Sequence, residues 1–380
     1  GDSLPVSAFA EHVDGQFELG ASAYEKRGVA VSVPTWDANK CIQCNQCAYV
    51  CPHATIRPFA LTAEEAKNAP EAAKIVDVKA GKGKGVYKYT MAISPLDCMG
   101  CAVCVGQCPV DALTMVDQEQ EAAQQEVFNY CVSQVSEKKD MQDNTVKGSQ
   151  FRQPMLEFSG SCAGCAETSY ARLVTQLFGD HMYISNATGC SSIWGGPAAT
   201  SPYCANKEGH GPAWCNSLFE DNAEFGLGFR LTVDQHRVRV MRLLEQFADN
   251  IPAELNDALH AEATPEVRRE QVAALRQHLK DVEGAQQLLT DADALVEKSI
   301  WLIGGDGWAY DIGFGGLDHV LSLTENVNIL VLDTQCYSNT GGQASKATPL
   351  GAVTKFGEHG KRKARKDLGV SMMMYGHVYV

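Results

Sequence analysis

Eight of the 15 cysteines form two runs with identical spacing, and this feature limits the possible folds more than any other. A small secreted domain would use so many cysteines in disulfides, but tight, repeated clusters inside a chain of 380 residues indicate metal ligands. The chain must therefore fold so that each run curls around an inorganic centre. The two runs are Cys41-x2-Cys44-x2-Cys47-x3-Cys51-Pro52 and Cys98-x2-Cys101-x2-Cys104-x3-Cys108-Pro109.

This spacing is that of bacterial ferredoxins with two 4Fe-4S clusters, in which the fourth cysteine of each run ligates the other cluster. Zinc is the alternative, but paired zinc sites do not use this three-plus-one spacing. We therefore predict a small α+β ferredoxin-like domain over residues 31–120, with an insertion at 57–97. The first cluster is expected on Cys41, Cys44, Cys47 and Cys108, and the second on Cys98, Cys101, Cys104 and Cys51.

A third group of cysteines follows, with Cys162-Ala-Gly-Cys165 and then Cys190 in a glycine turn. A single C-x-x-C serves thiol–disulfide exchange, zinc or clusters. The thioredoxin interpretation is disfavoured because no strand leads cleanly into the motif. A third 4Fe-4S cluster on Cys162, Cys165 and Cys190 fits better and needs a fourth ligand, for which Cys204 and Cys215 are weaker candidates.

A glycine turn near the end of the chain suits a diphosphate. The apolar segment Ile300–Ile303 enters Gly304-Gly305-Asp306-Gly307-Trp308, where backbone N–H groups at a helix start can face an anion. Asp306 would repel phosphate, so a Mg2+ ion between them is expected. In a parallel sheet the loop after the next strand, Val327–Leu332, emerges at the same edge. The alternative is an ordinary βαβ turn.

Periodicity and turn residues predict the remaining elements. We expect helices over Ala63–Ala73, Asp117–Glu126 and Tyr170–Phe178, and a long helical region that opens at Asn216–Phe229 and runs through Lys298 with a break at Pro252. Strands are expected over Val86–Ile93, Met182–Asn186 and Val378–Val380. The domain prediction is a linking or wrapping segment at 1–30, the ferredoxin-like domain at 31–120, a connecting segment at 121–155 and an α/β domain at 156–380.

Charge and hydropathy exclude some functions. A formal net charge of −14 and a pI near 5.2 argue against nucleic-acid binding, which needs a basic surface. The basic run Lys361–Lys366 is interpreted as a solvated face. No apolar run approaches the roughly 18 residues of a membrane span. Iron–sulfur ligands predict a cytoplasmic location or an anaerobic organelle such as a hydrogenosome. The chain begins at Gly1 rather than Met, so it is expected to be a fragment or a processed product.

Three motifs together resemble one enzyme family. The two ferredoxin runs, the pair CAGC and TGCSS, and the segments GDGWAYDIGFGGLDHVL and YSNTGGQASKATP are similar, in this order, to the C-terminal part of pyruvate:ferredoxin (flavodoxin) oxidoreductases. The resemblance implies an α/β thiamine diphosphate-binding domain with a mostly parallel sheet after the ferredoxin-like domain. It implies three 4Fe-4S clusters, thiamine diphosphate and Mg2+ as cofactors.

The resemblance also assigns roles to residues. Asp306, Thr334 and the carbonyl of Cys336 are expected to hold Mg2+, and Gly305, Gly307 and Trp308 to line the diphosphate. Asn339 is expected to reach the substrate as the catalytic residue. Further contacts to the thiamine cofactor are expected from Glu167, Cys190, Thr334, Gln335, Cys336, Tyr337, Ser338 and Asn339. In similar proteins the fourth ligand of the third cluster lies beyond the segment that corresponds to this chain.

The implied reaction is oxidative decarboxylation of pyruvate to acetyl-CoA and carbon dioxide, with electrons passing singly to ferredoxin or flavodoxin. The family's substrate-recognising residues lie in N-terminal domains that have no counterpart here, so this chain alone is expected to be inactive. Its expected partners are those domains or subunits, pyruvate and coenzyme A, and a second copy in a homodimer. The alternatives are an enzyme for another 2-oxoacid and a non-catalytic electron-transfer subunit.

Overall fold

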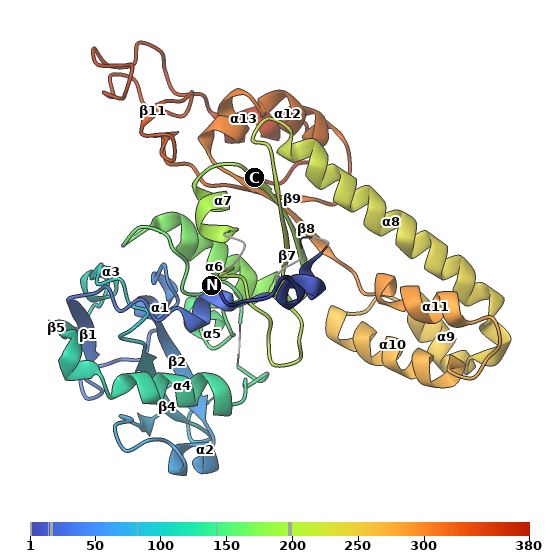
Figure 1. Cartoon of the computed structure of the whole chain (residues 1–380), viewed down its shortest axis with the longest axis horizontal. Helices are drawn as coiled ribbons and strands as arrows, with labels where there is room; N and C mark the ends of the chain where they lie inside the picture. Colours follow the sequence, from blue (N-terminus) through green and yellow to red (C-terminus); the bar gives the residue numbers. More distant parts are fainter. Residues whose placement is uncertain (1, 14, 16–17, 82, 142, 197–199) are drawn as a thin grey trace. The chain divides into compact units, whose positions relative to one another are not determined.

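The computed structural model describes residues 2–13, 15, 18–81, 83–141, 143–196 and 200–380. The chain divides into two compact units (Figure 1). The first comprises Gly1–Asp180 and Cys190–Pro212, and the second comprises His181–Gly189 and Ala213–Val380. These units are defined by packing, whereas the domain boundaries at residues 30, 120 and 155 remain predictions. None of the described helices has the length and apolar character needed to cross a membrane.

Two small antiparallel sheets hold the cysteine runs in the first unit. In one sheet β1 (Ser32–Trp36) pairs with β5 (Leu113–Asp117). In the other, β4 (Lys88–Ile93) lies between β2 (Ile56–Leu61) and β3 (Val76–Asp77). The first run lies between β1 and β2 and the second between β4 and β5, so each run is anchored to both sheets.

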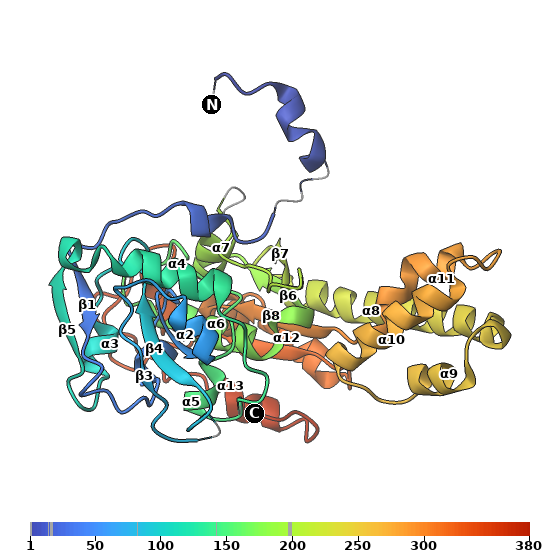
Figure 2. The ribbon, with the colours of Figure 1, turned by 90° about the horizontal axis from the view of Figure 1, so that it is seen from below.

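Short helices and turns complete the first unit around these sheets. Segment η1 buries no residue and, in Figure 2, extends away from the sheets of its unit. The elements are η1 (Val6–His12), η2 (Ala21–Tyr24), α1 (Gln46–Tyr49), α2 (Ala63–Lys67), α3 (Val103–Gly106), η3 (Gln118–Glu121), α4 (Gln124–Gln134), α5 (Val146–Ser149), α6 (Ala166–Phe178), η4 (Gly179–His181), whose last residue belongs to the second unit, and α7 (Cys190–Gly195).

Two predicted helices of this unit are displaced. Helix α2 begins with a capping box between Thr62 and Glu65, as its sequence favours, but it ends at Lys67 rather than Ala73. Pro70 explains the early end, because proline restricts the residue before it and cannot continue the hydrogen-bond ladder. The helix predicted over Asp117–Glu126 is also wrong in its bounds, since a 3-10 turn occupies Gln118–Glu121 and α4 starts at Gln124.

The second unit is built on a parallel sheet in the order β7 (Ala213–Ser217), β6 (Met182–Ala187), β8 (Ser299–Gly304) and β9 (Asn328–Val331). All three pairings are parallel. The predicted strands at Met182, Ile300 and Val327 are confirmed within one or two residues at each end. The fold class is therefore as predicted: a dicluster ferredoxin-like region followed by an α/β region with a parallel sheet.

Helices of the second unit pack on this sheet and extend beyond it. Helix α8 (Asn222–Gln246) starts against β6 and β8 and runs to a separate helical end that has its own apolar core (Figure 1). The remaining elements are η5 (Ala248–Asn250), α9 (Ala253–His260), α10 (Pro265–Leu279), α11 (Gln286–Asp291), η6 (Ala292–Leu295), η7 (Gly307–Asp311), α12 (Phe314–Ser322), β10 (Cys336–Tyr337), β11 (Gln343–Ala344) and α13 (Leu368–Met373).

Three details of the second unit differ from expectation. Of the segment Asn216–Phe229, which was predicted to open the helical region, the first two residues instead complete β7, and α8 starts at Asn222. Pairing with β6 overrides the weak local helix preference. The predicted strand Val378–Val380 is not a strand, and Tyr379 is fully exposed. β-prone residues without a partner strand leave their backbone groups to water. The break predicted near Pro252 is confirmed, because α9 begins at the next residue.

Candidate functional site

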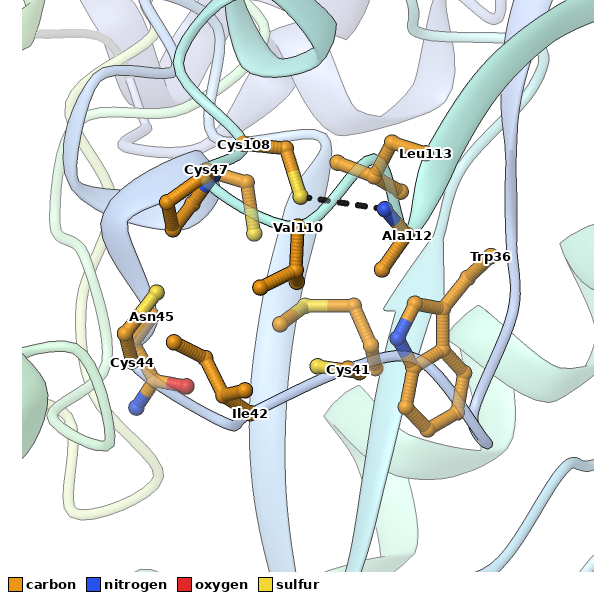
Figure 3. Close-up of a pocket in the computed structure, with 12 residues that line it drawn as sticks. Trp36, Cys41, Ile42, Cys44, Asn45, Cys47, Cys108, Val110, Ala112 and Leu113 are labelled. Atoms are coloured by element: carbon orange, nitrogen blue, oxygen red, sulfur yellow. Dashed lines mark hydrogen bonds between the residues drawn. The ribbon is translucent and has the colours of Figure 1, made fainter.

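Four cysteines from both runs surround one cavity in the first unit (Figure 3). Cys41, Cys44 and Cys47 come from the first run, and Cys108 comes from the end of the second. Apolar side chains, including Trp36, complete the wall. The three-plus-one set predicted for the first cluster is therefore brought together by the fold.

The second set is assembled in the same crossed manner. The thiols of Cys51 and Cys101 both lie close enough to those of Cys98 and Cys104 to raise their pKa values. The Cys47 thiol of the first set also raises the pKa of Cys104, so the two sets are neighbours. Each run thus gives its last cysteine to the set of the other run, which is the exchange that the spacing predicts.

The two runs have the same backbone conformation as well as the same spacing. Left-handed φ values occur at corresponding positions, at Gln43, Asn45 and Ala54 in the first run and at Gly100, Ala102 and Asp111 in the second. The tight turns direct backbone N–H groups at sulfur. Gln43 donates to Cys41 Sγ at 3.3 Å, Gly100 to Cys98 Sγ at 3.4 Å and Ala112 to Cys108 Sγ at 3.2 Å.

These features fit a cubane cluster. N–H···S bonds to ligating sulfur atoms are among the factors that set cluster potentials. A cluster of several atoms needs thiols spread around a cavity, as Cys41, Cys44, Cys47 and Cys108 are.

The protonation of these thiols follows from their burial. Burial, followed by the neighbouring thiols, raises the pKa of Cys47 and Cys104 well above the ordinary value, and burial raises that of Cys98 to about 11. Without a metal centre these side chains are neutral at pH 7. Because ligation requires thiolates, assembly of the centre must release protons.

The third group of cysteines belongs to the first unit too. Cys162 and Cys165 share one turn, in which the Cys165 N–H donates to the Cys162 carbonyl at 3.0 Å, and α6 starts directly after it. Cys190 is the first residue of α7. Their ligation of a third cluster stays a prediction, as does its fourth ligand: Cys204 is buried, whereas Cys215 is exposed on β7 of the second unit.

In the second unit the predicted magnesium ligands form one connected network. Asp306 is 3% exposed, and its carboxylate accepts hydrogen bonds from the Thr334 N–H at 3.0 Å and the Ser345 hydroxyl at 2.8 Å. Thr334 Oγ1 in turn donates to the Cys336 carbonyl at 3.0 Å. These three predicted ligands follow β8 and β9, with Cys336 at the start of β10, at the carboxyl edge of the parallel sheet.

The chemistry of this donor set suits a hard cation. A carboxylate, a hydroxyl and a carbonyl are all oxygen ligands of the kind Mg2+ prefers. Burial raises the pKa of Asp306, the donors Ser345 and Thr334 oppose that shift, and the nearby Asp333 and Asp311 reinforce it. A divalent cation would relieve this crowding of carboxylates, so the residues present fit a bound Mg2+.

The turn around Asp306 is closed by the later loop. A Cβ atom on Gly307 would come within 2.4 Å of the Tyr337 ring, so only glycine fits there. Tyr337 donates to Asp311 Oδ2 at 2.7 Å, which holds the β10–β11 turn against η7. Trp308 is 1% exposed in the core of the unit, so only its backbone can face a ligand.

The other predicted contacts are placed as follows. Gly305 borders the Leu332 carbonyl, Ser338 shares a hydrogen bond with Thr334 at 2.6 Å, and Gln335 has a left-handed φ of 63°. Asn339 lies exposed in the turn between β10 and β11.

Glu167 belongs to the first unit, where it accepts a hydrogen bond from Trp194 Nε1 at 2.9 Å. The cofactor contacts of Glu167, Cys190 and Asn339 stay predictions.

Several polar groups around these sites were missed by sequence reasoning. Ser345 holds Asp306 from a loop that follows the motif. Lys26 pairs with Asp97 at 2.6 Å, next to the predicted ligand Cys98, and Arg172 donates to the backbone carbonyl of Cys51 at 3.1 Å. Lys26 and Arg172 bind partners 71 and 121 residues away, so no local pattern could have revealed them.

Comparisons with known proteins cover the whole chain. A family model described as a 4Fe-4S dicluster domain matches residues 40–112, and the EKR model, described as a domain of unknown function, matches residues 1–30. The full chain is 61% identical to a probable pyruvate-flavodoxin oxidoreductase of Escherichia coli K12, 51% to a pyruvate-flavodoxin oxidoreductase of Klebsiella pneumoniae and 51% to a pyruvate:ferredoxin oxidoreductase of Moorella thermoacetica. It covers 33%, 33% and 34% of these proteins, so it spans about one third of their length.

Proposed function

We propose that this chain forms the electron-transfer and thiamine diphosphate-binding part of a pyruvate:ferredoxin or pyruvate-flavodoxin oxidoreductase, the enzymes that it resembles over about one third of their length. The enzyme oxidatively decarboxylates pyruvate in the presence of coenzyme A. Acetyl-CoA and carbon dioxide are released, and two electrons leave one at a time for ferredoxin or flavodoxin.

The observation that carries this proposal is the occurrence of two unrelated cofactor frameworks in one chain. Crossed cysteine sets converge in the first unit, and an oxygen-ligand network around Asp306 occurs in the second. A non-catalytic electron carrier would need only the cysteines. The buried Asp306 carboxylate, held at the edge of a parallel sheet, has no use in such a carrier.

The chain's own residues have defined tasks in the proposed enzyme. The eight thiolates hold two clusters, and Cys162, Cys165 and Cys190 contribute to a third. Asp306, Thr334 and the Cys336 carbonyl hold Mg2+, and the backbone around Gly307 faces the diphosphate. When bound, thiamine diphosphate supplies stabilisation of the negative charge left by decarboxylation, and the clusters supply one-electron acceptors.

The protein holds the Asp306 carboxylate and the neighbouring turn in a preorganised arrangement. Ser345 and the Thr334 N–H orient the Asp306 carboxylate before any ligand arrives. Tyr337 and Asp311 hold the β10–β11 turn close to Gly307. Because the network already exists in the chain, little reorganisation is needed when charge develops.

We propose pyruvate as the substrate, from the likeness to pyruvate oxidoreductases. We also propose that the chain associates with further domains or subunits of the enzyme and forms a homodimer, in the cytoplasm or an anaerobic organelle. The test uses the full-length assembly with coenzyme A and oxidised ferredoxin or flavodoxin. Carbon dioxide release should be fastest from pyruvate. Faster release from 2-oxoglutarate or an aryl pyruvate would identify that 2-oxoacid as the substrate. If no oxoacid released carbon dioxide, the chain would instead be interpreted as part of a non-catalytic electron-transfer subunit.

A further inference from the structure

Arg172 is a buried cation in contact with the backbone of a cluster ligand. It lies on α6, which begins directly after the Cys162–Cys165 turn, and it is 2% exposed. Its guanidinium donates to the Cys51 carbonyl at 3.1 Å and to the Tyr49 carbonyl at 2.6 Å. Two amide oxygens complete its surroundings, from Gln150 at 2.9 Å and Gln176 at 2.7 Å.

The charge of Arg172 is not balanced by a carboxylate. Among the described residues, each of its hydrogen bonds goes to a neutral oxygen. Arg57 is also buried in the first unit, but its charge is balanced in the usual way, by an ion pair with the Glu157 carboxylate. A buried guanidinium stays protonated and is costly unless an opposite charge lies nearby.

A 4Fe-4S cluster with four thiolate ligands supplies that opposite charge. Its net charge is negative, and reduction adds one further negative charge. A fixed cation beside the cluster therefore stabilises the reduced form more than the oxidised form. The cluster that includes Cys51 is the one that Arg172 reaches, since the guanidinium binds the carbonyl of that ligand.

We propose that Arg172 is the counter-cation of the cluster held by Cys51, Cys98, Cys101 and Cys104 and that it raises the reduction potential of this cluster. The inference rests on the proposed function, because it requires the cluster to be present. Arg172 acts here as a positioning and charge-setting residue on the helix that follows Cys165. It thereby links the third group of cysteines to the ferredoxin-like part.

Two variants cancel the positive charge of Arg172 in different ways. Arg172→Gln deletes the cation, whereas Gln176→Glu keeps the arginine and places a carboxylate where the amide oxygen now accepts its hydrogen bond. Both should shift the reduction equilibrium of one cluster by about tenfold toward the oxidised form, which is about 59 mV for one electron. Arg172→Lys keeps the charge and should restore most of the wild-type potential.

A matched control is available in the helical end of the second unit. Arg268 is 3% exposed and also donates to backbone carbonyls, at Ala258 and Leu259. Arg268→Gln makes the same chemical change in a region without predicted ligands, and every cluster potential should stay unchanged.

The experiment is an EPR-monitored redox titration of the purified full-length holoprotein, with iron content measured for each variant. The affected signal is assigned by its loss in Cys104→Ser. A lower potential in Arg172→Gln and Gln176→Glu, with recovery in Arg172→Lys, supports the inference. Full iron content with unchanged potentials in the charge-removing variants overturns it, and if Arg172→Gln fails to assemble, Gln176→Glu alone decides. Wild-type protein without the two ferredoxin-like clusters would instead refute the proposed function.

Discussion

The ion pair between Lys26 and Asp97 gives a quantitative test of what the first 30 residues do for the cluster region. Lys26 Nζ lies 2.6 Å from Asp97 Oδ2, and the Asp97 side chain is only 2% exposed. Asp97 precedes the predicted ligand Cys98 and also accepts a hydrogen bond from Ser94. The neighbouring Gly28 N–H donates to the Leu96 carbonyl at 2.8 Å. This part of the matched EKR segment therefore holds the loop that enters the second cysteine run.

The expected cost of Lys26→Met follows from burial. Removing one partner of a buried ion pair costs about 3–5 kcal/mol, because the other charge is left unpaired. Lys26 itself is 31% exposed, so some water reaches the pair, and we reduce the electrostatic loss to about 2 kcal/mol. The ammonium also lies 4.8 Å from the Phe158 ring centre, which adds about 0.5–1 kcal/mol. The total is roughly 3 kcal/mol.

Lys88→Met provides the matched control. Lys88 pairs with Asp77 at the same distance of 2.6 Å, but the two side chains are 47% and 82% exposed. A pair so open to water contributes no more than about 1 kcal/mol. The assay is urea unfolding of the holoprotein, followed by loss of visible cluster absorbance. Equal destabilisation by the two substitutions, or a larger effect of Lys88→Met, would refute the argument from burial.

Two further predictions concern single carboxylates. Asp306→Asn should weaken Mg2+-dependent thiamine diphosphate binding by at least about 100-fold, since loss of an outer-shell partner alone costs about 10–100-fold in metal affinity. Calorimetry of the full-length protein measures the affinity, and the iron content should not change. An affinity equal to that of the wild type would show that Asp306 is not part of the site. Burial alone would raise the pKa of Glu65, but hydrogen bonds from Lys138, Ser136 and Thr62 lower it to about 2. The lowered pKa stabilises the folded state above the unfolded pKa of about 4.3, and this contribution is lost as the pH falls toward 2. Glu65→Gln should therefore lower the free energy of unfolding in urea by about 2–3 kcal/mol at pH 7. The difference in stability from the wild type should narrow below pH 4. A difference that does not depend on pH would contradict the assignment.

Local spacing made much of this molecule predictable. The crossed cysteine sets follow from short runs whose turns leave little conformational choice, and the Asp306–Thr334–Cys336 network follows from loops that leave one edge of a parallel sheet. Element type was also readable where apolar strands were strong, as at Ile300–Ile303.

Long-range partners were not predictable. Arg172 looks like an ordinary polar residue of an amphipathic helix until Cys51 is placed beside it. Strand β7 forms because β6 offers a partner, whereas Val378–Val380 lacks one and stays irregular despite its β-prone residues. For Arg172 and β7 the deciding interaction joins segments that are far apart in the chain. For Val378–Val380 the pairing with a partner strand is missing.

The most direct test of the central claim is a cofactor analysis of the purified full-length protein that contains this chain. Iron, acid-labile sulfide, zinc and thiamine diphosphate should be measured on the same sample. We expect iron and sulfide for three 4Fe-4S clusters and one thiamine diphosphate per chain, without zinc in stoichiometric amount. Zinc in place of iron, or protein that binds no thiamine diphosphate in the presence of Mg2+, would contradict it.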